Sequence, residues 1–493
     1  MAGGASDTLN TLGLDAAASG SRRSFLEGLA AGGRRTALGV GASSGLFAPS
    51  SSSASVVSAE EKVVLDVGTY TLRAGFSGDA QPLHREELYG VFGARRSADH
   101  RRAVGRRHGL LLPPATTTAS VAPEENDSQW QQQQQEEVEV ERALLEHVRQ
   151  VYRGHLLVDA KTKKVAVVVD SRTLPMSVRR ALVRVLLGNL RVPQVSFYPR
   201  PVVALMTCGR STGLVVDCGF RVTTVTPVYD SRPLMPYTVV TPLAGHAVHQ
   251  CVRRLLVRFG RLRRDTASTE EKEDDDVDAM LTDSVVAHVV AGLLYAAPTS
   301  VRRATADDGH SLANADLFGD EMAEWYARNT SPPSTTELEL ALADAAGRRR
   351  VLAVPSWVLG RATEILLAGD KPSDHMGVVD ALVACIAGVP LDTRRALVGG
   401  LLVTGGVSQV PNFASRVLED LALTLEGSSR WSALARDVAL ADCLPAANGA
   451  VFNPADRPWI GASVVVAARI GGVDIRRDEF DEIPLAALLA RLD

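Results

Sequence analysis

The feature that most constrains the fold is a duplicated turn, in which an apolar run ends in Asp-x-Gly and a second strand-like run follows. The first copy, VVLDVGTYTLRAGFSGD, contains Asp66 and Gly68, and the second, LVVDCGFRVTTVTPVYD, contains Asp217 and Gly219. Each copy predicts a β-hairpin. The backbone N–H groups of such a turn can bind a phosphate, and the aspartate can hold the water shell of Mg²⁺. Two such hairpins facing each other would hold a polyphosphate from both sides.

A third glycine motif lies in the C-terminal part of the chain. Gly405 and Gly406 follow the apolar run 401–404 and precede the helical pattern VPNFASRVLEDL. Two glycines at such a point let the backbone approach a planar or phosphorylated ligand closely. Each of the three motifs is weak by itself, because Asp-x-Gly after a strand is usually only a turn. Their combination in this order is much more specific for a nucleotide site.

The rest of the chain indicates an α/β protein. Apolar residues recur at helical spacing over 140–152, 178–186 and 248–256, and KVAVVVD at 164–170 is typical of a buried strand. Apolar residues make up 46% of the 493 residues, so the chain can build a sizeable core and more than one domain-sized unit.

Charge and cysteine content exclude some functions. The net charge of −4 argues against direct binding of nucleic acid or of a membrane surface by the chain as a whole. The five cysteines form no CxxC pair and have no histidine at zinc spacing, which is typical of buried thiols in a reducing compartment. The longest uncharged apolar stretch, 284–301, contains His288 and Pro298, so an amphipathic helix explains it better than a membrane span.

Low-complexity segments interrupt this pattern. Residues 1–61 are rich in Gly, Ala and Ser, and we interpret them as a disordered tail. Within them SRRSFLEGLAAGG resembles a twin-arginine export signal, although two arginines interrupt its apolar stretch, and an arginine-rich transit peptide is the other targeting option. Residues 95–137 are Arg-rich and then Gln-rich, which predicts a solvated loop rather than a site for phosphate or an acidic partner. Irregular loops are also predicted over 263–280 and 299–350.

Blocks across most of the chain resemble the actin superfamily. The two Asp-x-Gly segments are similar to actin's two phosphate loops, PLDTRRALVGGLLVTGGVSQVPNF to its adenosine-side motif, and WIGASVVVA with IRRDEFDE to its C-terminal segment. The resemblance implies an α/β, actin-like fold with two RNase-H-like halves about a nucleotide cleft. The first half would comprise residues 62–208 and 458–493, and the second residues 209–457. The insertion 95–137 would replace actin's inserting-loop subdomain.

The resemblance also implies a site for ATP or ADP with Mg²⁺. Asp66 and Asp217 would act through Mg-bound water, so no residue is expected to ligate the metal directly. The cofactor-binding residues implied by the matching motifs are Asp66, Gly68, Thr69, Arg73, Asp217, Gly219, Gly405 and Gly406.

Departures from actin indicate a degenerate ATPase cleft and no enzymatic activity. Phe220 stands where actin has an aspartate, and Arg200 and Thr224 align with its water-positioning glutamine and the histidine beside it. An arginine cannot accept the proton of an attacking water, so no catalytic residue is predicted. Actin's adenosine-side Lys–Glu pair falls on Val290 and Ala291, which would weaken recognition of the base.

Within the superfamily, YRGHLLVDAKTKKVAVVVDSRTLP and VVDCGFRVTTVTPVYDSRPLM resemble the actin-related protein 10 (also called 11) subfamily of the dynactin pointed end. This implies a cytoplasmic, cytoskeletal protein that caps the pointed end of the dynactin actin-like filament. It would link that filament to pointed-end adaptor subunits in dynein-driven microtubule transport, and would not polymerise alone. The alternative is a nuclear actin-related subunit of a chromatin-remodelling complex, where the arginine-rich insertion would find a use. A sugar- or chaperone-type ATPase of the same fold class is a further reading, against which Phe220, Arg200 and Thr224 argue.

Overall fold

The computed structural model describes residues 61–88, 123–170, 172–264, 277–299, 337–343, 349–370, 373–441 and 452–491. All of them lie in the compact unit Ala59–Asp493. The predicted tail, up to residue 60, lies outside the described residues.

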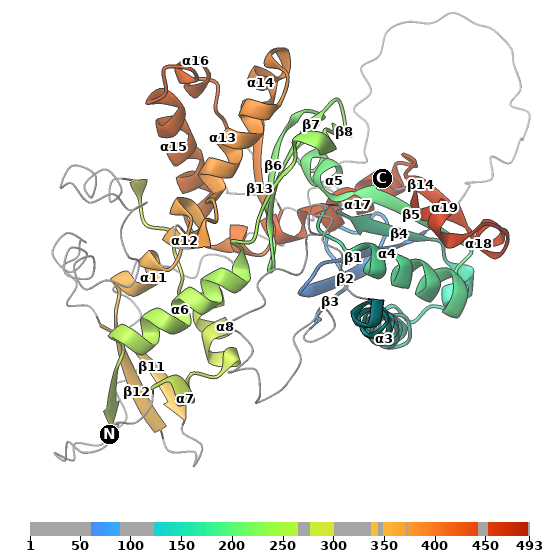
Figure 1. Cartoon of the computed structure of the whole chain (residues 1–493), viewed down its shortest axis with the longest axis horizontal. Coiled ribbons are helices and arrows are strands. Elements are labelled where there is room, and N and C mark those ends of the chain that lie inside the picture. The colour runs from blue at the N-terminus through green and yellow to red at the C-terminus, as the bar shows by residue number, and fades with distance from the viewer. Residues whose placement is uncertain are drawn as a thin grey trace, which may run out of the picture. The chain divides into compact units, whose positions relative to one another are not determined.

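Six strands form the first sheet: β1 (Val63–Val67), β2 (Thr71–Phe76), β3 (His84–Glu87), β4 (Val165–Val169), β5 (Gln194–Pro199) and β14 (Val473–Arg476). Their order in the sheet is β14-β5-β4-β1-β2-β3 (Figure 1). β1, β4 and β5 are parallel, whereas β2, β3 and β14 are antiparallel to their neighbours. β1 and β4 are buried at every residue, as expected for apolar runs in the middle of a sheet that is covered on both faces.

Helices pack on both faces of the first sheet. Alternate residues of a strand point to opposite faces, and since β1 and β4 are apolar at nearly every residue, both faces must be covered. They are α3 (Pro123–Gln150), η1 (Val151–Leu156), η2 (Ala160–Thr162), α4 (Met176–Val183), η3 (Arg184–Asn189), α5 (Arg200–Met206), η7 (Pro454–Asp456), α17 (Arg457–Ala467), α18 (Arg477–Glu482) and α19 (Leu485–Leu489). Val63 and Leu65 of β1 share a buried core with Leu144 of α3. Val64, which lies between them in sequence, shares a separate core with Trp459 of α17.

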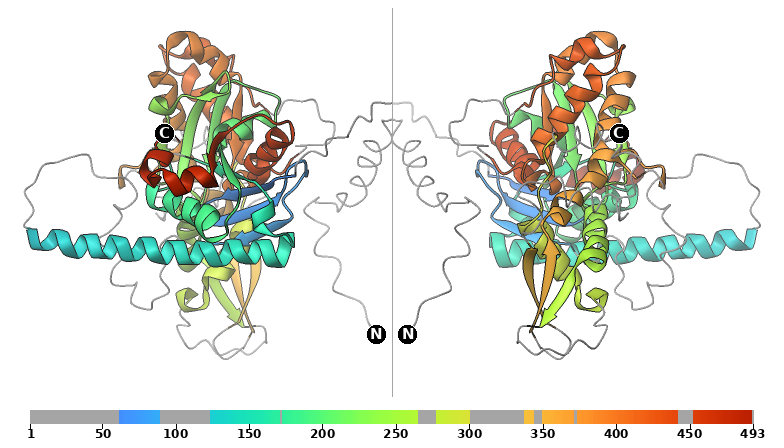
Figure 2. Two further views of the ribbon diagram at one scale, coloured as in Figure 1. Left: turned by 90° about the vertical axis from the view of Figure 1, so that its right-hand side faces the viewer. Right: turned by 90° about the vertical axis from the view of Figure 1, so that its left-hand side faces the viewer.

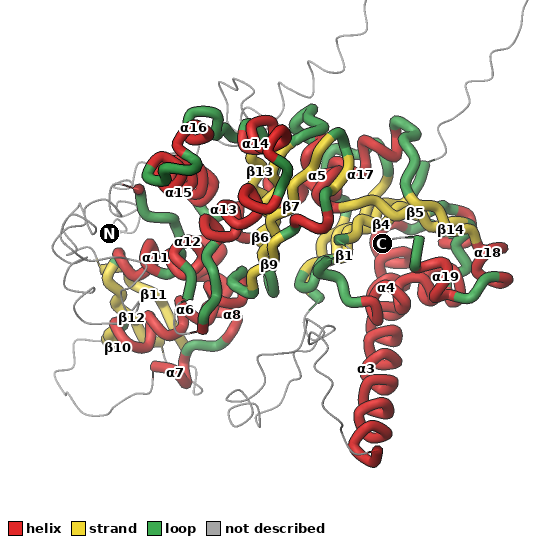
Figure 3. Tube along the Cα trace, turned by 45° about the horizontal axis from the view of Figure 1, so that its top comes forward, coloured by secondary structure: helices red, strands yellow, loops and turns green. Residues whose placement is uncertain are grey.

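The second sheet is built from β6 (Gly213–Cys218), β7 (Thr223–Tyr229), β8 (Arg232–Pro233), β9 (Val239–Thr241) and β13 (Leu401–Thr404). Its order is β13-β6-β7-β8, and β9 also pairs with β7. β13 runs parallel to β6, and the other pairs are antiparallel. Figure 3 shows β6, β7, β9 and β13 as one group and β1, β4, β5 and β14 as another.

The helices of the second part surround a large apolar core. They are η4 (Met235–Tyr237), α6 (Gly245–Phe259), α8 (Asp283–Gly292), α11 (Trp357–Arg361), α12 (Glu364–Ala368), α13 (Val378–Gly388), α14 (Leu391–Val398), η6 (Val407–Gln409), α15 (Phe413–Glu426) and α16 (Ser432–Ala435). The helical period predicted over 248–256 is confirmed as the buried face of α6. Val248 and Leu255 of this face pack in one cluster with Val216 of β6.

Both predicted hairpins are confirmed. β1 pairs with β2, and β6 pairs with β7, each antiparallel. In the first turn the Gly68 N–H donates to the Thr71 carbonyl oxygen over 2.9 Å. In the second turn the Gly219 N–H donates to the Val222 carbonyl oxygen over 3.2 Å. Each Asp-x-Gly therefore closes a tight turn, as the sequence pattern predicts.

Two stretches predicted to be irregular contain regular structure instead. The elements concerned are β10 (Arg261–Arg264), α7 (Val277–Met280), β11 (Glu337–Ala343) and β12 (Arg349–Pro355), of which the strands form an antiparallel sheet in the order β10-β12-β11. The prediction is therefore wrong at both ends of 263–280 and in the C-terminal part of 299–350. In ELELALA every second residue is leucine, which suits a strand, but the charged and low-complexity flanks masked that signal. Most other residues of both stretches lie outside the described residues.

The helix α3 corrects part of the predicted insertion. A solvated loop over 95–137 is wrong from Pro123 onward, where α3 begins and continues as one helix to Gln150 (Figure 2). Pro suits the first turn of a helix, and Glu and Gln are good helix formers. Leu144 and Val148 are fully buried, so they hold a turn from which the helix extends toward its N-terminus. Residues 95–122 lie outside the described residues.

Candidate functional site

The two Asp-x-Gly hairpins are joined by one arginine. Arg200, the first residue of α5, donates from Nη2 to the Oδ1 atom of Asp66 in β1. Its Nη1 atom lies 3.6 Å from the Oδ2 atom of Asp217 in β6. Because Asp66 belongs to the first sheet and Asp217 to the second, these contacts, the Arg200 bridge, cross from one sheet to the other. The Arg200 residue is only 8% exposed, and Asp66 is fully buried.

A second group of charges extends the Arg200 bridge along the first sheet. Arg73 in β2 donates to the other carboxylate oxygen of Asp66 over 3.2 Å, and from Nε to Asp456 over 2.9 Å. Arg85 in β3 donates to both oxygens of Asp456, over 2.5 and 3.2 Å. Both carboxylate oxygens of Asp66 therefore accept hydrogen bonds from guanidinium groups of this chain.

Aromatic rings connect the two turns directly. Tyr70 in the first turn and Phe220 in the second are stacked, with ring centroids 4.3 Å apart and an interplanar angle of 26°. The rings of His246 and His249 meet Phe220 edge-on at 5.7 and 5.5 Å. The Tyr70 hydroxyl donates to a carboxylate oxygen of Glu87 over 2.9 Å, which fixes its ring. This ring stack explains why a bulky residue is tolerated in the second turn.

The third motif packs against the second hairpin. Gly405 has a φ of +93°, and a Cβ atom there would lie 2.5 Å from Oδ1 of Asp217 and would clash with the Cys218 carbonyl oxygen. Only glycine fits this approach. Gly406 is exposed, and a Cβ atom there would have no neighbour within 4 Å. The structure thus brings Asp66, Asp217 and Gly405 together.

The remaining predicted residues take different positions around the group formed by Asp66, Asp217, Arg200 and Gly405, which we call the centre. Gly68 lies beside Arg200, whose Nη2 atom would be 3.9 Å from a Cβ atom on Gly68. Thr69 and Gly219 are half-buried in their turns. On the adenosine side, Val290 packs against the core and Ala291 is exposed, both in α8.

Burial and charge shift the ionisation of these groups. Burial raises the pKa of Asp217, the neighbouring charge of Arg200 opposes that shift, and the carboxylates of Asp170 and Asp66 add to it. Burial alone would lower the pKa of Arg200, but the charges of Asp66, Asp217 and Asp170 outweigh it and raise the pKa. Arg200 therefore stays protonated, and it cannot act as a base.

These contacts do not suit the predicted Mg²⁺ site well. A Mg²⁺ ion held through water would need acceptor oxygens of Asp66 and Asp217 directed at its water shell. Both oxygens of Asp66 already accept from Arg200 and Arg73, and Arg200 also approaches Asp217. The assignment of nucleotide binding to the eight motif residues stays a prediction that this geometry disfavours.

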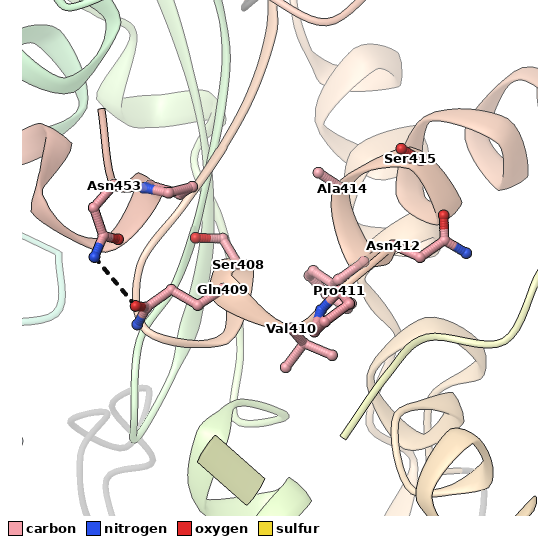
Figure 4. A pocket seen from close by; sticks show the side chains of 10 residues that line it. Ser408, Gln409, Val410, Pro411, Asn412, Ala414, Ser415 and Asn453 are labelled. Carbon is pink, nitrogen blue, oxygen red and sulfur yellow. Dashed lines mark hydrogen bonds between the residues drawn. The ribbon is translucent and has the colours of Figure 1, made fainter. Parts of the chain in front are cut away.

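A cavity of about 380 Å³ lies beside the third motif (Figure 4). Asn453 donates from Nδ2 to Oε1 of Gln409 over 3.3 Å at one side of it. No charged side chain is among the lining residues, so the cavity offers hydrogen bonds but no cation for a phosphate. Its lining consists of the segment from Ser408 to Ser415 together with Asn453 and Pro454.

Sequence reasoning missed several residues of the centre. Arg85 and Asp456 are 371 residues apart, so no local pattern could have paired them. Tyr70 offered a signal, because an aromatic residue follows the Asp-x-Gly of both turns, as Tyr70 and as Phe220. Within the part of the chain that the structure describes, no group of three His, Cys, Asp or Glu side chains is arranged to hold a metal ion. The helices described there include none that is both long and apolar enough to cross a membrane.

Comparison with known proteins identifies relatives. The family model described as Actin matches residues 57–290. Actin-related protein 4 of Arabidopsis thaliana is 25% identical over 304 residues, which cover 59% of this chain and 62% of that protein. Actin-related protein 4 of Oryza sativa subsp. japonica is 22% identical over 326 residues, covering 64% of this chain and 68% of that protein. Actin-related protein 10 of Dictyostelium discoideum is 29% identical over 92 residues, 19% of each chain.

These matches correct the predicted subfamily. The likeness to actin-related protein 10 is confined to a short segment, whereas the likeness to actin-related protein 4 covers more than half of the chain. The predicted capping of the dynactin filament and the predicted cytoplasmic localisation are therefore wrong. Short blocks such as 152–175 and 215–235, which include the turn with Phe220, are not enough to assign the chain to one branch of the superfamily. The sheets, the paired Asp-x-Gly hairpins and the match of residues 57–290 with the Actin family model agree, and they show an actin-like α/β fold in a chain that is similar to actin-related proteins.

Proposed function

We propose that the chain is a non-catalytic actin-related subunit of a nuclear chromatin-remodelling complex. The observation that carries the proposal is the match with actin-related protein 4, which favours the nuclear alternative over dynactin. The match spans 62% of the Arabidopsis protein, so the set of partners is part of the proposal. The low net charge of the chain suits a subunit that is recruited through protein partners rather than by nucleic acid directly.

The non-catalytic part of the proposal rests on Arg200 and Thr224. Hydrolysis of a nucleotide needs a positioned water and a group that takes its proton. Arg200 occupies the aligned position and is engaged with Asp66, and its raised pKa keeps it a cation. Thr224 is buried in β7, paired in register with Asp217, and cannot accept a proton as a histidine would. A scaffold role needs the shape of the actin fold but not its chemistry.

Affinity purification of the tagged full-length chain tests the partner assignment. Nuclear and cytoplasmic fractions are purified separately, and the bound proteins are quantified by mass spectrometry. We expect the nuclear fraction to be enriched in subunits of a chromatin-remodelling ATPase, at near-equal stoichiometry with the chain. A stable complex with cytoplasmic filament proteins, or a protein recovered without partners from both fractions, would contradict the proposal.

Phosphate release tests the absence of catalysis. The purified chain is incubated with Mg-ATP, and the rate is compared with that of Asp217→Ala, which removes a carboxylate of the centre. We expect both proteins to release phosphate at the rate of a protein-free blank. A rate that exceeds the blank in the natural chain and falls to it in Asp217→Ala would show that the cleft is an active ATPase.

A further inference from the structure

We infer that this chain closes its cleft with its own cation, Arg200, in the place where an actin-like protein would use Mg²⁺ and a polyphosphate. The two sheets then stay together without a nucleotide. This inference concerns the conformation of the chain alone, and it does not depend on which complex the chain joins.

The Arg200 bridge has the geometry of a clamp between two bodies. Arg200 sits at the start of α5 and pairs with Asp66 on the first sheet and Asp217 on the second. A planar guanidinium has donors on both of its terminal nitrogens, so one side chain can engage two carboxylates. α5 itself packs on both sides, through Val203 in the core with Trp459 and through Leu205 in the core with Val215. The cation is therefore anchored in the element that joins the sheets.

The charges of the centre are consistent with an internal cation. The carboxylates of Asp66 and Asp170 and the guanidinium groups of Arg200 and Arg73 all lie close enough to Asp217 to act on its charge. Asp456 is neutralised by Arg73 and Arg85. A Mg²⁺ ion with its water shell would have to displace Arg200 from a fully buried carboxylate. The guanidinium group of Arg200 would then lose its ion pair with Asp66 inside the protein, and breaking a buried ion pair is strongly unfavourable.

The turns themselves are also engaged. A phosphate between two hairpins would need turn N–H groups directed at it. The Gly68 N–H already donates to Thr71, and the Gly219 N–H to Val222. The Gly219 and Phe220 carbonyls accept from the first turn of α6, through the N–H groups of Gly245 and His246. The Tyr70–Phe220 stack adds apolar contact between the turns where a phosphate would lie.

Thermal unfolding of the full-length chain tests the inference without any variant. A protein that needs Mg-nucleotide to close gains stability by mass action when the ligand is present at many times its Kd. We expect Mg-ATP or Mg-ADP at about 1 mM to change the Tm by less than about 1 °C, and EDTA to have no effect. A rise of several degrees that EDTA abolishes, or nucleotide retained at one per chain after purification, would overturn it.

Substitution of Arg200 tests the clamp itself. We expect Arg200→Gln to lower the Tm by several degrees and to speed amide hydrogen exchange in both hairpins. Arg210→Gln is the matched control. Arg210 is exposed and donates to the carbonyl oxygen of Gly399 over 3.0 Å, so its substitution should change neither the Tm nor the exchange in the hairpins. If the amides of both hairpins exchange in Arg200→Gln at the same rate as in the unsubstituted chain, the inference is contradicted.

A double variant keeps the inference testable where Arg200→Gln alone fails to fold. In Asp66→Asn with Arg200→Gln the carboxylate and its cation are removed together. The loss of Tm should then be smaller than the sum of the losses of the two single changes, since neither Asp66 nor Arg200 is left as a buried charge without the other. Where Arg200→Gln does not fold, the milder Arg200→Lys takes its place in the comparison with Asp66→Asn. If the losses of Tm are strictly additive, Asp66 and Arg200 do not act as a pair. A failed partner purification leaves all these results unchanged, so the two proposals fail separately.

Discussion

At the scale of single residues, burial and neighbouring charges decide the ionisation of the aspartates in the two hairpins. Asp66 accepts hydrogen bonds from two guanidinium groups, whereas Asp217 has Arg200 at 3.6 Å and, besides its burial, the carboxylates of Asp170 and Asp66 near enough to raise its pKa. Two aspartates in equivalent turns therefore differ in their electrostatic surroundings. The same contrast separates Gly405, which packs tightly, from Gly406, which faces solvent. Both contrasts should be measurable as changes in the free energy of unfolding.

The raised pKa of Asp217 predicts a dependence of stability on pH. Because the folded pKa lies above the ordinary value of 3.8, the folded state binds more protons than the unfolded state between the two values. The free energy of unfolding should therefore fall as pH rises above about 3.8 through this window. Urea unfolding of the natural chain and of Asp217→Asn, measured at several pH values, isolates the contribution. The natural chain should lose stability relative to Asp217→Asn as pH rises. The opposite slope would mean that the pairing with Arg200 outweighs burial.

The pair Gly405 and Gly406 predicts opposite outcomes of the same substitution. Gly405→Ala places a methyl group on a backbone with a φ of +93° and against the Cys218 carbonyl, so we expect a loss of more than about 2 kcal/mol. Gly406→Ala meets no atom within 4 Å and should change the free energy of unfolding by less than about 0.5 kcal/mol. Urea unfolding at one pH measures both. Equal effects would show that the third motif does not approach the second hairpin as described.

At the scale of elements, the helix α3 shows how composition and position act together. Its sequence is rich in Glu and Gln, which allows a helix without requiring one. Its C-terminal part adds Leu144 and Val148, which pack in the core of the first sheet. Tertiary packing of one end therefore stabilises a segment whose composition alone suggests a solvated loop.

Two substitutions in α3 separate its buried and exposed faces. Leu144→Ala removes a fully buried side chain, so we expect it to lower the free energy of unfolding by about 2–5 kcal/mol. Val138→Ala, at a residue that is 65% exposed in the same helix, should cost less than about 0.5 kcal/mol. Chemical denaturation followed by circular dichroism compares them. Similar losses at both positions would show that α3 is not anchored through Leu144.

At the scale of the whole molecule, α5 connects the two sheets. Its Val203 packs with Val64 and Trp459 next to the first sheet, and its Leu205 packs with Val215 of the second. Arg200 adds the charged contact at the start of the same helix. Because this short helix belongs to both apolar cores, neither core is complete without it. Unfolding of one core should therefore destabilise the other.

This shared helix predicts that the two sheets unfold cooperatively. We expect one transition, in which backbone amides of β4 and of β6 lose protection against hydrogen exchange at the same urea concentration. Leu205→Ala should lower that midpoint for both strands together, although its side chain packs on the second sheet's side. Mass spectrometry of exchanged peptides resolves the two strands. Two separate midpoints, with only β6 affected by Leu205→Ala, would contradict the coupling.

Local sequence was enough to determine the elements of this protein whose signals lie within a few residues. The two Asp-x-Gly hairpins, the buried strand β4 and the apolar face of α6 follow from patterns of neighbouring residues. The actin-like fold followed from the order of such blocks along the chain. The strand β11 and the start of α3 did not, because charged or low-complexity flanks hid weak patterns that only packing stabilises.

Only the tertiary structure decided what lies between the hairpins. Arg73 and Asp456 are 383 residues apart, and Arg200 and Asp66 are 134 apart, so no local pattern pairs them. The sequence marked Arg200 as a change from glutamine and Phe220 as a change from aspartate, but not what each would contact. The fold places Arg200 against two carboxylates and Phe220 against Tyr70. Ion pairs and ring contacts depend on distances between side chains in space, and chain order carries no record of those distances.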